Sequence, residues 1–264
     1  MGVLLRVLFC LVLNIKIKKY MNYKLLQNEV ELQKFIDFLP ELKPNECYFL
    51  ILIARKKWNP ESNIPSATKL KRETVNKKDK IIQTIRQMEV AEGIFTNNEI
   101  AIPQENLGVY IGYNPRDQYK ASFELINKCL TAIKTNKQNI NVKSMANDVI
   151  QASYGTKNFM DIDVDIKEGE DYNEIVKFIK SVIDEKYLNF FKTSGGFHCL
   201  INLNHPDFKS SDKNESDLIS PNFGKKWYPE LQKHQFKSEL NIMSNDLMPM
   251  PGCNQGKFVP FMFK

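Results

Sequence analysis

Apolar residues follow alternating helical and strand spacings from residue 22 onward. Helical spacing predicts helices over residues 27–39 and 81–88. The continuous apolar run 47–55 ends in charged residues and predicts a buried strand, and residues 107–113 predict a second one. The stretch 54–72, which follows the first strand, is polar and basic and holds two prolines. It therefore predicts a long loop.

A further helix is predicted after the Asn114-Pro115 dipeptide. Asp117 lies directly before it and can serve as its N-cap. Five apolar residues then repeat at helical spacing: Leu125, Ile126, Cys129, Leu130 and Ile133.

The spacing of apolar and polar residues becomes more regular after residue 153. Residues 157–165 alternate strictly and predict a strand with one apolar and one acidic face. The acidic face holds Asp161, Asp163 and Asp165. Asp171, with Glu174 three residues later, predicts the start of an amphipathic helix.

Two more strands are predicted at residues 187–193 and 197–203, around the tight Ser194-Gly195-Gly196 connection. A helix near 225–235 and strand-like pieces at 240–250 and 258–263 complete the pattern. The order β-α-β-β-α-β is the split arrangement of ferredoxin-like folds. We therefore expect an α+β protein.

This order of elements predicts where the chemistry lies. The first and third strands should be neighbours in the centre of the sheet, and the fourth should flank the first. The first strand carries Asp161 and Asp163, the third carries His198, and Asp246 lies in the approach to the last strands. We expect these side chains to meet on the open face of the sheet. Carboxylates suit Mg²⁺ or Mn²⁺, and two such ions can clamp an in-line phosphoryl displacement.

Each of these residues also has an ordinary structural explanation. The aspartates can form a solvated strand face, and His198 can be a core or surface histidine. The Ser194-Gly195-Gly196 segment is a hairpin turn under either interpretation. The carboxylates of an acidic strand face repel one another unless a cation neutralises them. This repulsion, and the occurrence of all these residues at the expected places in one order of elements, favour the metal site.

Composition excludes several classes of protein. The 264 residues are 42% hydrophobic and 26% charged, which excludes a disordered chain, a collagen and a multi-pass membrane protein. The five cysteines are scattered without a C-x-x-C pair, so we expect reduced thiols rather than disulfides or zinc ligands.

Charge is distributed unevenly along the chain. Residues 1–150 hold 23 Lys and Arg against 15 Asp and Glu, whereas residues 151–264 hold 14 against 16. This asymmetry suggests a polyanion bound by the first part and metal chemistry in the second. A merely Lys-rich surface explains it equally well.

Residues 1–21 stand apart from the rest. The apolar run Val3–Ile15 is short for a membrane span, is interrupted by Arg6, and has no small-residue cleavage site after it. We interpret the segment as an over-extended start, with a packed N-terminal element and a membrane anchor as alternatives. We assign it no function.

Three motifs together resemble those of the archaeo-eukaryotic primase superfamily. They are D-I-D at 161–163, T-S-G-G-F-H at 193–198, and Asp246 followed by M-P-M-P-G-C-N-Q-G-K at 248–257. The last is similar to the P-G-T-x-Q-G-type segment of viral and plasmid primase-polymerases, although Cys253 and Asn254 replace two of its positions. N-P-R-D-Q-Y-K-A at 114–121 resembles an Asn-Pro-Arg element of the viral members.

The resemblance implies a primase-like fold. Residues 1–21 would be a doubtful extension, residues 22–152 a basic α/β unit, and residues 153–264 an RNA-recognition-motif-like catalytic unit. The last two would form one primase-polymerase domain.

The resemblance also implies residue roles. Asp161, Asp163 and Asp246 would hold two divalent ions, Mg²⁺ or Mn²⁺, and His198 would join them as a catalytic residue. The triphosphate of the incoming nucleotide would contact Ser194, Gly195, Gly196 and His198, with Lys257 beside it. Gly252 and Gly256 would let the backbone approach the ligand. Lys257 can alternatively be a solvent-facing lysine.

Template contacts are expected in the basic half. Candidates for nucleic-acid binding are Arg55, Lys56, Lys57 and Arg116, and the same basic stretch continues through Lys69, Lys71 and Arg72. A solvated loop, and a structural ion pair of Arg116 with Asp117 or a neighbour, are the alternatives.

The implied function is that of a DNA-directed primase-polymerase, a nucleotidyltransferase that makes short primers on single-stranded DNA from nucleoside triphosphates. A replicative helicase is a candidate partner, and we expect a cytoplasmic protein (host cytoplasm if phage-encoded) with no stable membrane partner. An end-joining or repair polymerase of the same superfamily shares every residue named. A non-catalytic nucleic-acid-binding module is the other alternative, but such sheets present aromatic residues for base stacking, whereas this one presents aspartates.

Overall fold

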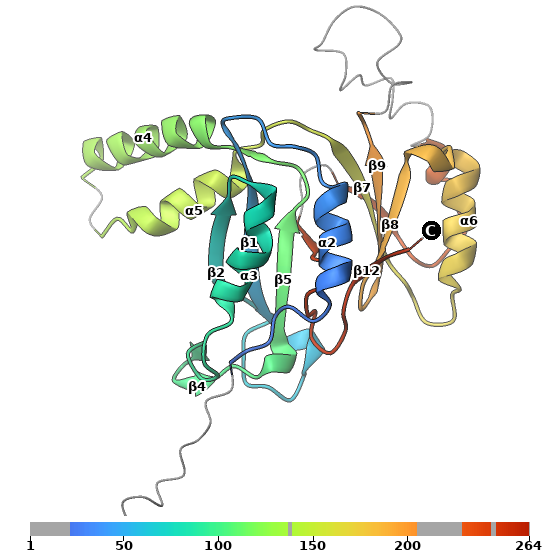
Figure 1. Cartoon of the computed structure of the whole chain (residues 1–264), viewed down its shortest axis with the longest axis horizontal. Coiled ribbons are helices and arrows are strands. Elements are labelled where there is room, and N and C mark those ends of the chain that lie inside the picture. The colour runs from blue at the N-terminus through green and yellow to red at the C-terminus, as the bar shows by residue number, and fades with distance from the viewer. Residues whose placement is uncertain (1–21, 137–138, 205–228, 244–246, 264) are drawn as a thin grey trace, which may run out of the picture.

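The computed structural model describes residues 22–136, 139–204, 229–243 and 247–263. Within these ranges the chain forms two five-stranded antiparallel sheets and one two-stranded sheet, with helices packed around them (Figure 1). The predicted α+β class is confirmed. The predicted extension 1–21 lies outside the described residues.

The first sheet contains both strands predicted in the N-terminal half. Its order is β11 (Leu247–Pro249), β5 (Leu107–Gly112), β1 (Glu46–Arg55) and β2 (Ala67–Val75), and β6 (Arg116–Asp117) pairs with the start of β1. The predicted loop 54–72 is wrong in its second part, because β2 begins at Ala67. This edge strand is rich in Lys, Arg, Glu and Thr, and Val75 is its one buried residue. Its sequence therefore lacks the apolar alternation from which strands are predicted.

The second sheet has the predicted neighbours. Its order is β10 (Leu240–Met243), β7 (Phe159–Asp165), β9 (Gly196–Asn202), β8 (Leu188–Lys192) and β12 (Phe261–Phe263). The first and third strands of the unit, β7 and β9, pair in the centre, and the fourth, β10, flanks the first. Helix α6 (Tyr172–Val182) connects β7 to β8, and its predicted N-cap Asp171 accepts a hydrogen bond from the backbone nitrogen of Asn173. Residues 229–231 of the helix predicted near 225–235 are helical, and 225–228 lie outside the described residues.

The strand-like region predicted at 240–250 divides between the two sheets. β10 ends at Met243 beside β7, whereas β11 begins at Leu247 and pairs with β5 of the first sheet. The expectation that this region belongs only to the second unit is therefore wrong. The predicted boundary at residue 153 does not divide the chain into one sheet before it and one after it, because residues 247–249 belong to the first sheet.

Helix α2 (Glu29–Phe38) lies between the two sheets and joins their cores (Figure 1). Its Phe38 ring stacks on Phe159 of β7 at 5.0 Å between ring centroids. Its Phe35 ring meets Phe191 of β8 edge-on at 5.6 Å. Because the same cluster continues into Leu50 of β1, the two sheets share one apolar core.

Helix α6 covers the other face of the second sheet. Its Ile175 and Ile179 are fully buried in one cluster with Ile162 and Val164 of β7. The alternation predicted for β7 is thus confirmed, with the isoleucine and valine toward α6. The acidic positions are turned to the side of α2 and the first sheet.

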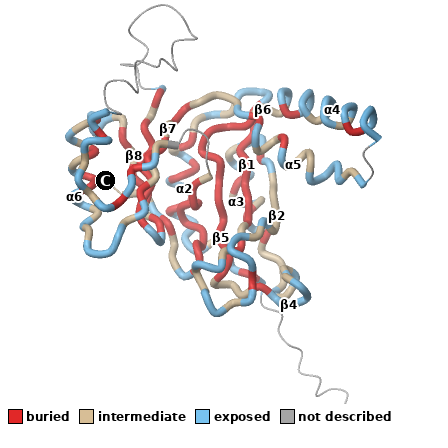
Figure 2. Tube along the Cα trace, turned by 180° about the vertical axis from the view of Figure 1, so that it is seen from behind, coloured by how far each residue is buried: buried red, intermediate tan, exposed pale blue. Residues whose placement is uncertain are grey.

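Helices α4 (Gln118–Lys134) and α5 (Val142–Ala152) form a hairpin that projects from the first sheet, away from the second (Figures 1 and 2). Asp117 caps α4 as predicted, by accepting a hydrogen bond from the backbone nitrogen of Lys120 at 2.9 Å. Helix α3 (Ile81–Met88) packs on the face of the first sheet opposite to α5. No helix among the described residues is both long and apolar enough to cross a membrane.

Candidate active site between the two sheets

Three of the predicted site residues meet on the inner face of the second sheet. Asp161 and Asp163 occupy alternate positions of β7, and His198 of β9 is paired with Asp163 across the ladder. The His198 Nδ1 atom lies 2.7 Å from Asp161 Oδ2, and its Nε2 atom lies 3.6 Å from Asp163 Oδ1. The imidazole therefore bridges the two carboxylates.

The site is more deeply buried than predicted. Asp161 is 0% exposed and His198 is 6% exposed, so the expected open sheet face is wrong for these residues. They are covered because α2 and the first sheet pack on the same side of the second sheet. The side chain of Asp163 is 33% exposed, and Asp165 is exposed. The site is therefore accessible toward the end of β7.

Burial and neighbouring charges set the protonation of the site. Burial raises the pKa of Asp163, and repulsion from Asp161 and Asp165 adds to this, while His198 and Lys57 oppose it. Burial alone would lower the pKa of His198, but the aspartates and the hydrogen bond to Asp161 outweigh it and raise that pKa to about 9. The imidazole is thus protonated at neutral pH and offsets part of the negative charge.

The carboxylates fit a hard divalent cation. Asp161 Oδ1 is buried without a hydrogen-bond partner, and buried carboxylate oxygens normally have one. Asp163 lies at the next position on the same face, so a cation held there would neutralise charge that His198 alone does not. No group of three or more His, Cys, Asp or Glu in the described part of the chain has the arrangement of a metal centre.

The predicted third carboxylate, Asp246, lies outside the described residues. The described residues that flank it belong to strands of different sheets. Met243 is paired with Asp161, and Leu247 is paired with Gly112.

Close backbone contacts shape the predicted glycine turn. A Cβ atom at Gly196 would lie 1.8 Å from the carbonyl oxygen of Val164, so only glycine fits where β9 begins beside β7. Thr193 donates its backbone N–H to the Gly196 carbonyl at 3.0 Å, which closes the turn. Ser194 and Gly195 are exposed at its tip. The predicted hairpin is confirmed, and its tip lies at the accessible end of the site.

The Asn-Pro-Arg element holds the start of β7 in place. The Asn114 side-chain oxygen accepts hydrogen bonds from the backbone nitrogens of Asn158 and Phe159 at 2.8 and 2.9 Å, and its amide nitrogen donates to the Phe159 carbonyl at 2.9 Å. Arg116 is 1% exposed, and its guanidinium lies 4.4 Å above the Tyr154 ring. A side chain this deeply buried cannot contact nucleic acid. The expectation that Arg116 binds nucleic acid is therefore wrong, and the residue has a structural role.

Two basic residues, Arg55 and Lys57, lie at the end of β1 and in the turn that follows it. Arg55, at the end of β1, donates Nη1 to Tyr110 Oη at 3.2 Å, and its guanidinium lies 5.9 Å from the Trp58 ring centroid. Burial raises the pKa of Tyr110, Arg55 and a hydrogen bond with Gln255 oppose this, and the charge of Asp163 adds to the increase, so Tyr110 and this carboxylate interact electrostatically. Arg55 and exposed Lys57 form no ion pair with any described residue.

The remaining basic candidates do not form one continuous surface. Lys56 is exposed next to Lys57. Lys69 and Arg72 of β2 bond to Gln151 and Asp148 of α5. Lys71 points to the other side of the sheet, where it donates to the Gln87 carbonyl of α3.

Two glycines of the 248–257 motif have a structural role. A Cβ atom at Gly252 (φ +79°) would lie 2.4 Å from the Asn28 carbonyl oxygen, and one at Gly256 (φ +67°) would lie 2.8 Å from Trp58. Protein atoms occupy the space where a Cβ atom would lie, so packing alone accounts for both glycines, and their predicted role beside a ligand stays a prediction. Lys257 follows them and is exposed.

Tyr110, Trp58 and Gln255 are site residues that sequence reasoning missed. Tyr110 lies in a buried strand and therefore resembles a core residue, and Trp58 lies in the stretch predicted as loop. Gln255 accepts a hydrogen bond from the backbone nitrogen of Ser194 at 2.8 Å. Its position inside the 248–257 motif is the one signal that could have identified it.

Comparisons of this chain with protein-family models, with curated proteins and with solved structures find no match in any of the three. The chemistry of the site is therefore inferred from its own residues. They are two carboxylates and a protonated imidazole on one sheet, with Arg55 at the end of a strand of the other sheet and Lys57 in the turn that follows it.

Proposed function

We propose that this chain is a metal-dependent, DNA-directed nucleotidyltransferase of the primase-polymerase kind, which makes short primers on single-stranded DNA. The observation that carries the proposal is the cluster of Asp161, Asp163 and His198, with Arg55 at the end of β1 and Lys57 in the turn that follows it. Burying charged groups costs folding free energy, and such clusters concentrate at functional sites.

The topology supports the same proposal. The strand order β10-β7-β9-β8 is that of an RNA-recognition-motif-like unit, the catalytic unit that the resemblance to primases implies. The D-I-D motif lies on the first strand of this unit, and the T-S-G-G-F-H motif forms the turn into the third.

The carboxylates and the histidine would divide the chemistry between them. Asp161 and Asp163, with Asp246 as the third carboxylate, would hold two Mg²⁺ or Mn²⁺ ions, which when bound would neutralise phosphate charge and favour ionisation of the attacking 3′-hydroxyl. His198 holds Asp161 by its Oδ2 atom and leaves Oδ1 free of hydrogen bonds. A phosphate contact by His198 would use Nε2, which in this structure faces Asp163.

The anionic part of the nucleotide would lie between the two sheets. Arg55 is held by Tyr110 and Trp58, and its planar guanidinium suits phosphate oxygens. Lys57 adds a second cation near Asp163. The exposed Ser194 hydroxyl and Gly195 at the turn would complete the phosphate contacts.

A repair or end-joining polymerase would use the same residues and differ only in its substrate. A purely nucleic-acid-binding module is disfavoured, because the face between the sheets presents aspartates that would repel backbone phosphates.

Primer synthesis by the full chain tests the proposal. The protein is incubated with circular single-stranded DNA, labelled ribo- or deoxyribonucleotides, and Mn²⁺ or Mg²⁺, without a primer. Short products are expected from the wild type and from Glu168→Gln, which removes an exposed carboxylate beyond β7. None are expected from Asp163→Asn.

A second arm supplies an annealed primer. Products only in this arm would assign the site to a repair or extending polymerase. Absence of products in both arms, with a folded protein, would refute the proposed function.

A further inference from the structure

Helix α4 carries a stripe of large apolar side chains that face solvent. The residues are spaced by four, three, four and three positions, which is the heptad spacing by which helices pair along a seam. Each is between 50 and 66% exposed. The α4 stripe consists of Tyr119, Phe123, Ile126, Leu130 and Ile133.

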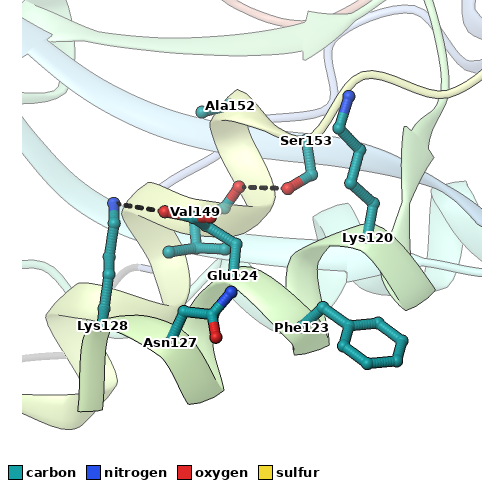
Figure 3. A pocket seen from close by; sticks show the side chains of 8 residues that line it. All are labelled: Lys120, Phe123, Glu124, Asn127, Lys128, Val149, Ala152 and Ser153. Carbon is teal, nitrogen blue, oxygen red and sulfur yellow. Dashed lines mark hydrogen bonds and ion pairs between the residues drawn. The ribbon is translucent and has the colours of Figure 1, made fainter. Parts of the chain in front are cut away.

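The stripe is not the face by which α4 joins the protein. The buried residues of the helix are Ala121 and Ala132, which lie about three turns apart on another side. Between α4 and α5 run two adjoining grooves of about 460 and 430 Å³. Figure 3 shows the first groove, with the Phe123 ring extending away from α5.

Basic residues border the stripe. Lys120 and Lys134 directly follow Tyr119 and Ile133 and lie on one flank of the stripe, whereas Lys128 lies on the opposite face of the helix and lines the groove beside α5. Glu124 is engaged by Lys128 at 3.9 Å. Neither Lys120 nor Lys134 forms an ion pair with a residue in the described ranges.

A second copy of the chain fits this surface poorly. Antiparallel pairing of two α4 helices about Ile126 brings Lys120 of one copy toward Lys134 of the other. Antiparallel pairing thus brings like charges together, and parallel pairing sets Lys134 beside Cys129 of the other copy, which offers no opposite charge.

We propose that α4 is a docking surface for an acidic amphipathic α-helix of another protein. The partner helix would place apolar residues at heptad spacing on the α4 stripe. Its glutamates or aspartates would lie along the flank that meets Lys120 and Lys134. This is the helix-in-groove mode of recognition, and it does not depend on the proposed chemistry of the carboxylate site.

Fluorescence anisotropy with the full chain tests this inference. Two labelled synthetic helical peptides carry leucine at every a and d position, one with glutamate and the other with lysine at e and g. We expect the glutamate peptide to bind at least about tenfold more tightly at low salt, with a difference that shrinks as salt rises. Leu130→Ser should weaken that binding about tenfold, as loss of a central apolar contact does.

Matched variants distinguish the contribution of the apolar stripe from that of the lysines beside it. Val30→Ser, which alters an exposed apolar residue on α2, should leave binding unchanged. Lys120→Gln combined with Lys134→Gln should abolish the preference between the peptides and leave residual binding through the leucines.

Several outcomes would overturn the inference. They are equal binding of the two peptides, no binding of either, or binding that Leu130→Ser does not change. A dimer in sedimentation that Leu130→Ser dissociates would assign the stripe to a second copy. Loss of single-stranded DNA binding in the lysine double variant would assign the surface to nucleic acid.

Discussion

On β7 and β9 the protein buries two ionisable side chains, whereas on α4 it exposes five large apolar ones. Both features cost folding free energy. Burying the ionisable side chains removes charge from water, and exposing the apolar side chains leaves apolar surface area in water. Helix α6 shows the ordinary outcome, since its apolar face is fully buried against the second sheet. The two exceptions therefore mark the places where we expect the molecule to act on something other than itself.

The largest expected effect comes from breaking the buried cluster at Asp163. Asp163→Asn should lower nucleotide incorporation at least about 100-fold, as loss of a group that stabilises transition-state charge does. Its stability should be equal or higher, because burial and the charges of Asp161 and Asp165 disfavour the ionised Asp163. Steady-state incorporation and thermal melting measure the two quantities on one sample. A variant that is active at the wild-type rate would contradict the metal assignment.

The next effect is on stability and comes from removing His198. His198→Ala leaves the fully buried Asp161 carboxylate without its charged partner, so the free energy of unfolding should fall by about 3 kcal/mol. Urea denaturation measures it. Adding Asp161→Asn to the same variant should restore part of the loss, since the orphaned charge is then gone. A loss that is equal in both variants would show that His198 stabilises by packing alone.

The same pair predicts a dependence on pH. The pKa of His198 is about 9 in the folded chain and 6.5 at its ordinary value, so its stabilisation is complete below pH 6.5 and is lost as the pH rises through 9. In the presence of a chelator, the wild type should lose stability across this interval more steeply than His198→Ala. Parallel curves would mean that the imidazole is not charged in the folded protein.

The sequence predicted which side chains form the cluster, but not its burial. Strict alternation places Asp161 and Asp163 on one strand face, and the β-α-β-β order sets β9 beside β7, so His198 could be located from the order of the elements. The cover over Asp161 comes from α2 and the first sheet, which are distant in the chain. Alternation tells which residues share a face and not what packs on it.

The same limit explains the other errors. Helical spacing in α4 predicts an apolar face, but whether that face is covered depends on the rest of the fold. β2 was predicted as loop because an edge strand tolerates polar residues on both sides. β11 joined the first sheet through pairing with β5, a long-range contact that no local pattern encodes.

A smaller effect is expected on the cationic side of the site. Lys57→Gln should raise the KM for nucleotide about fivefold, because Lys57 lies near enough to Asp163 to lower its pKa. Lys56→Gln, which changes the neighbouring exposed lysine, should change that KM by less than about twofold. Equal effects of the two variants would mean that general surface charge, rather than the position of Lys57, attracts the nucleotide.

The smallest effect is expected on α4 and completes the contrast with α6. Leu130→Ser should change the free energy of unfolding by less than about 0.5 kcal/mol, because the side chain already contacts solvent in the folded chain. Ile175→Ser, at a fully buried position of α6, should lower it by about 3 kcal/mol or more, since it removes core contacts and buries a hydroxyl. Urea denaturation at two protein concentrations measures both. If Leu130→Ser proved as costly as Ile175→Ser, Leu130 would be covered in solution, and the α4 stripe would be part of the protein's own packing rather than a surface left for a partner.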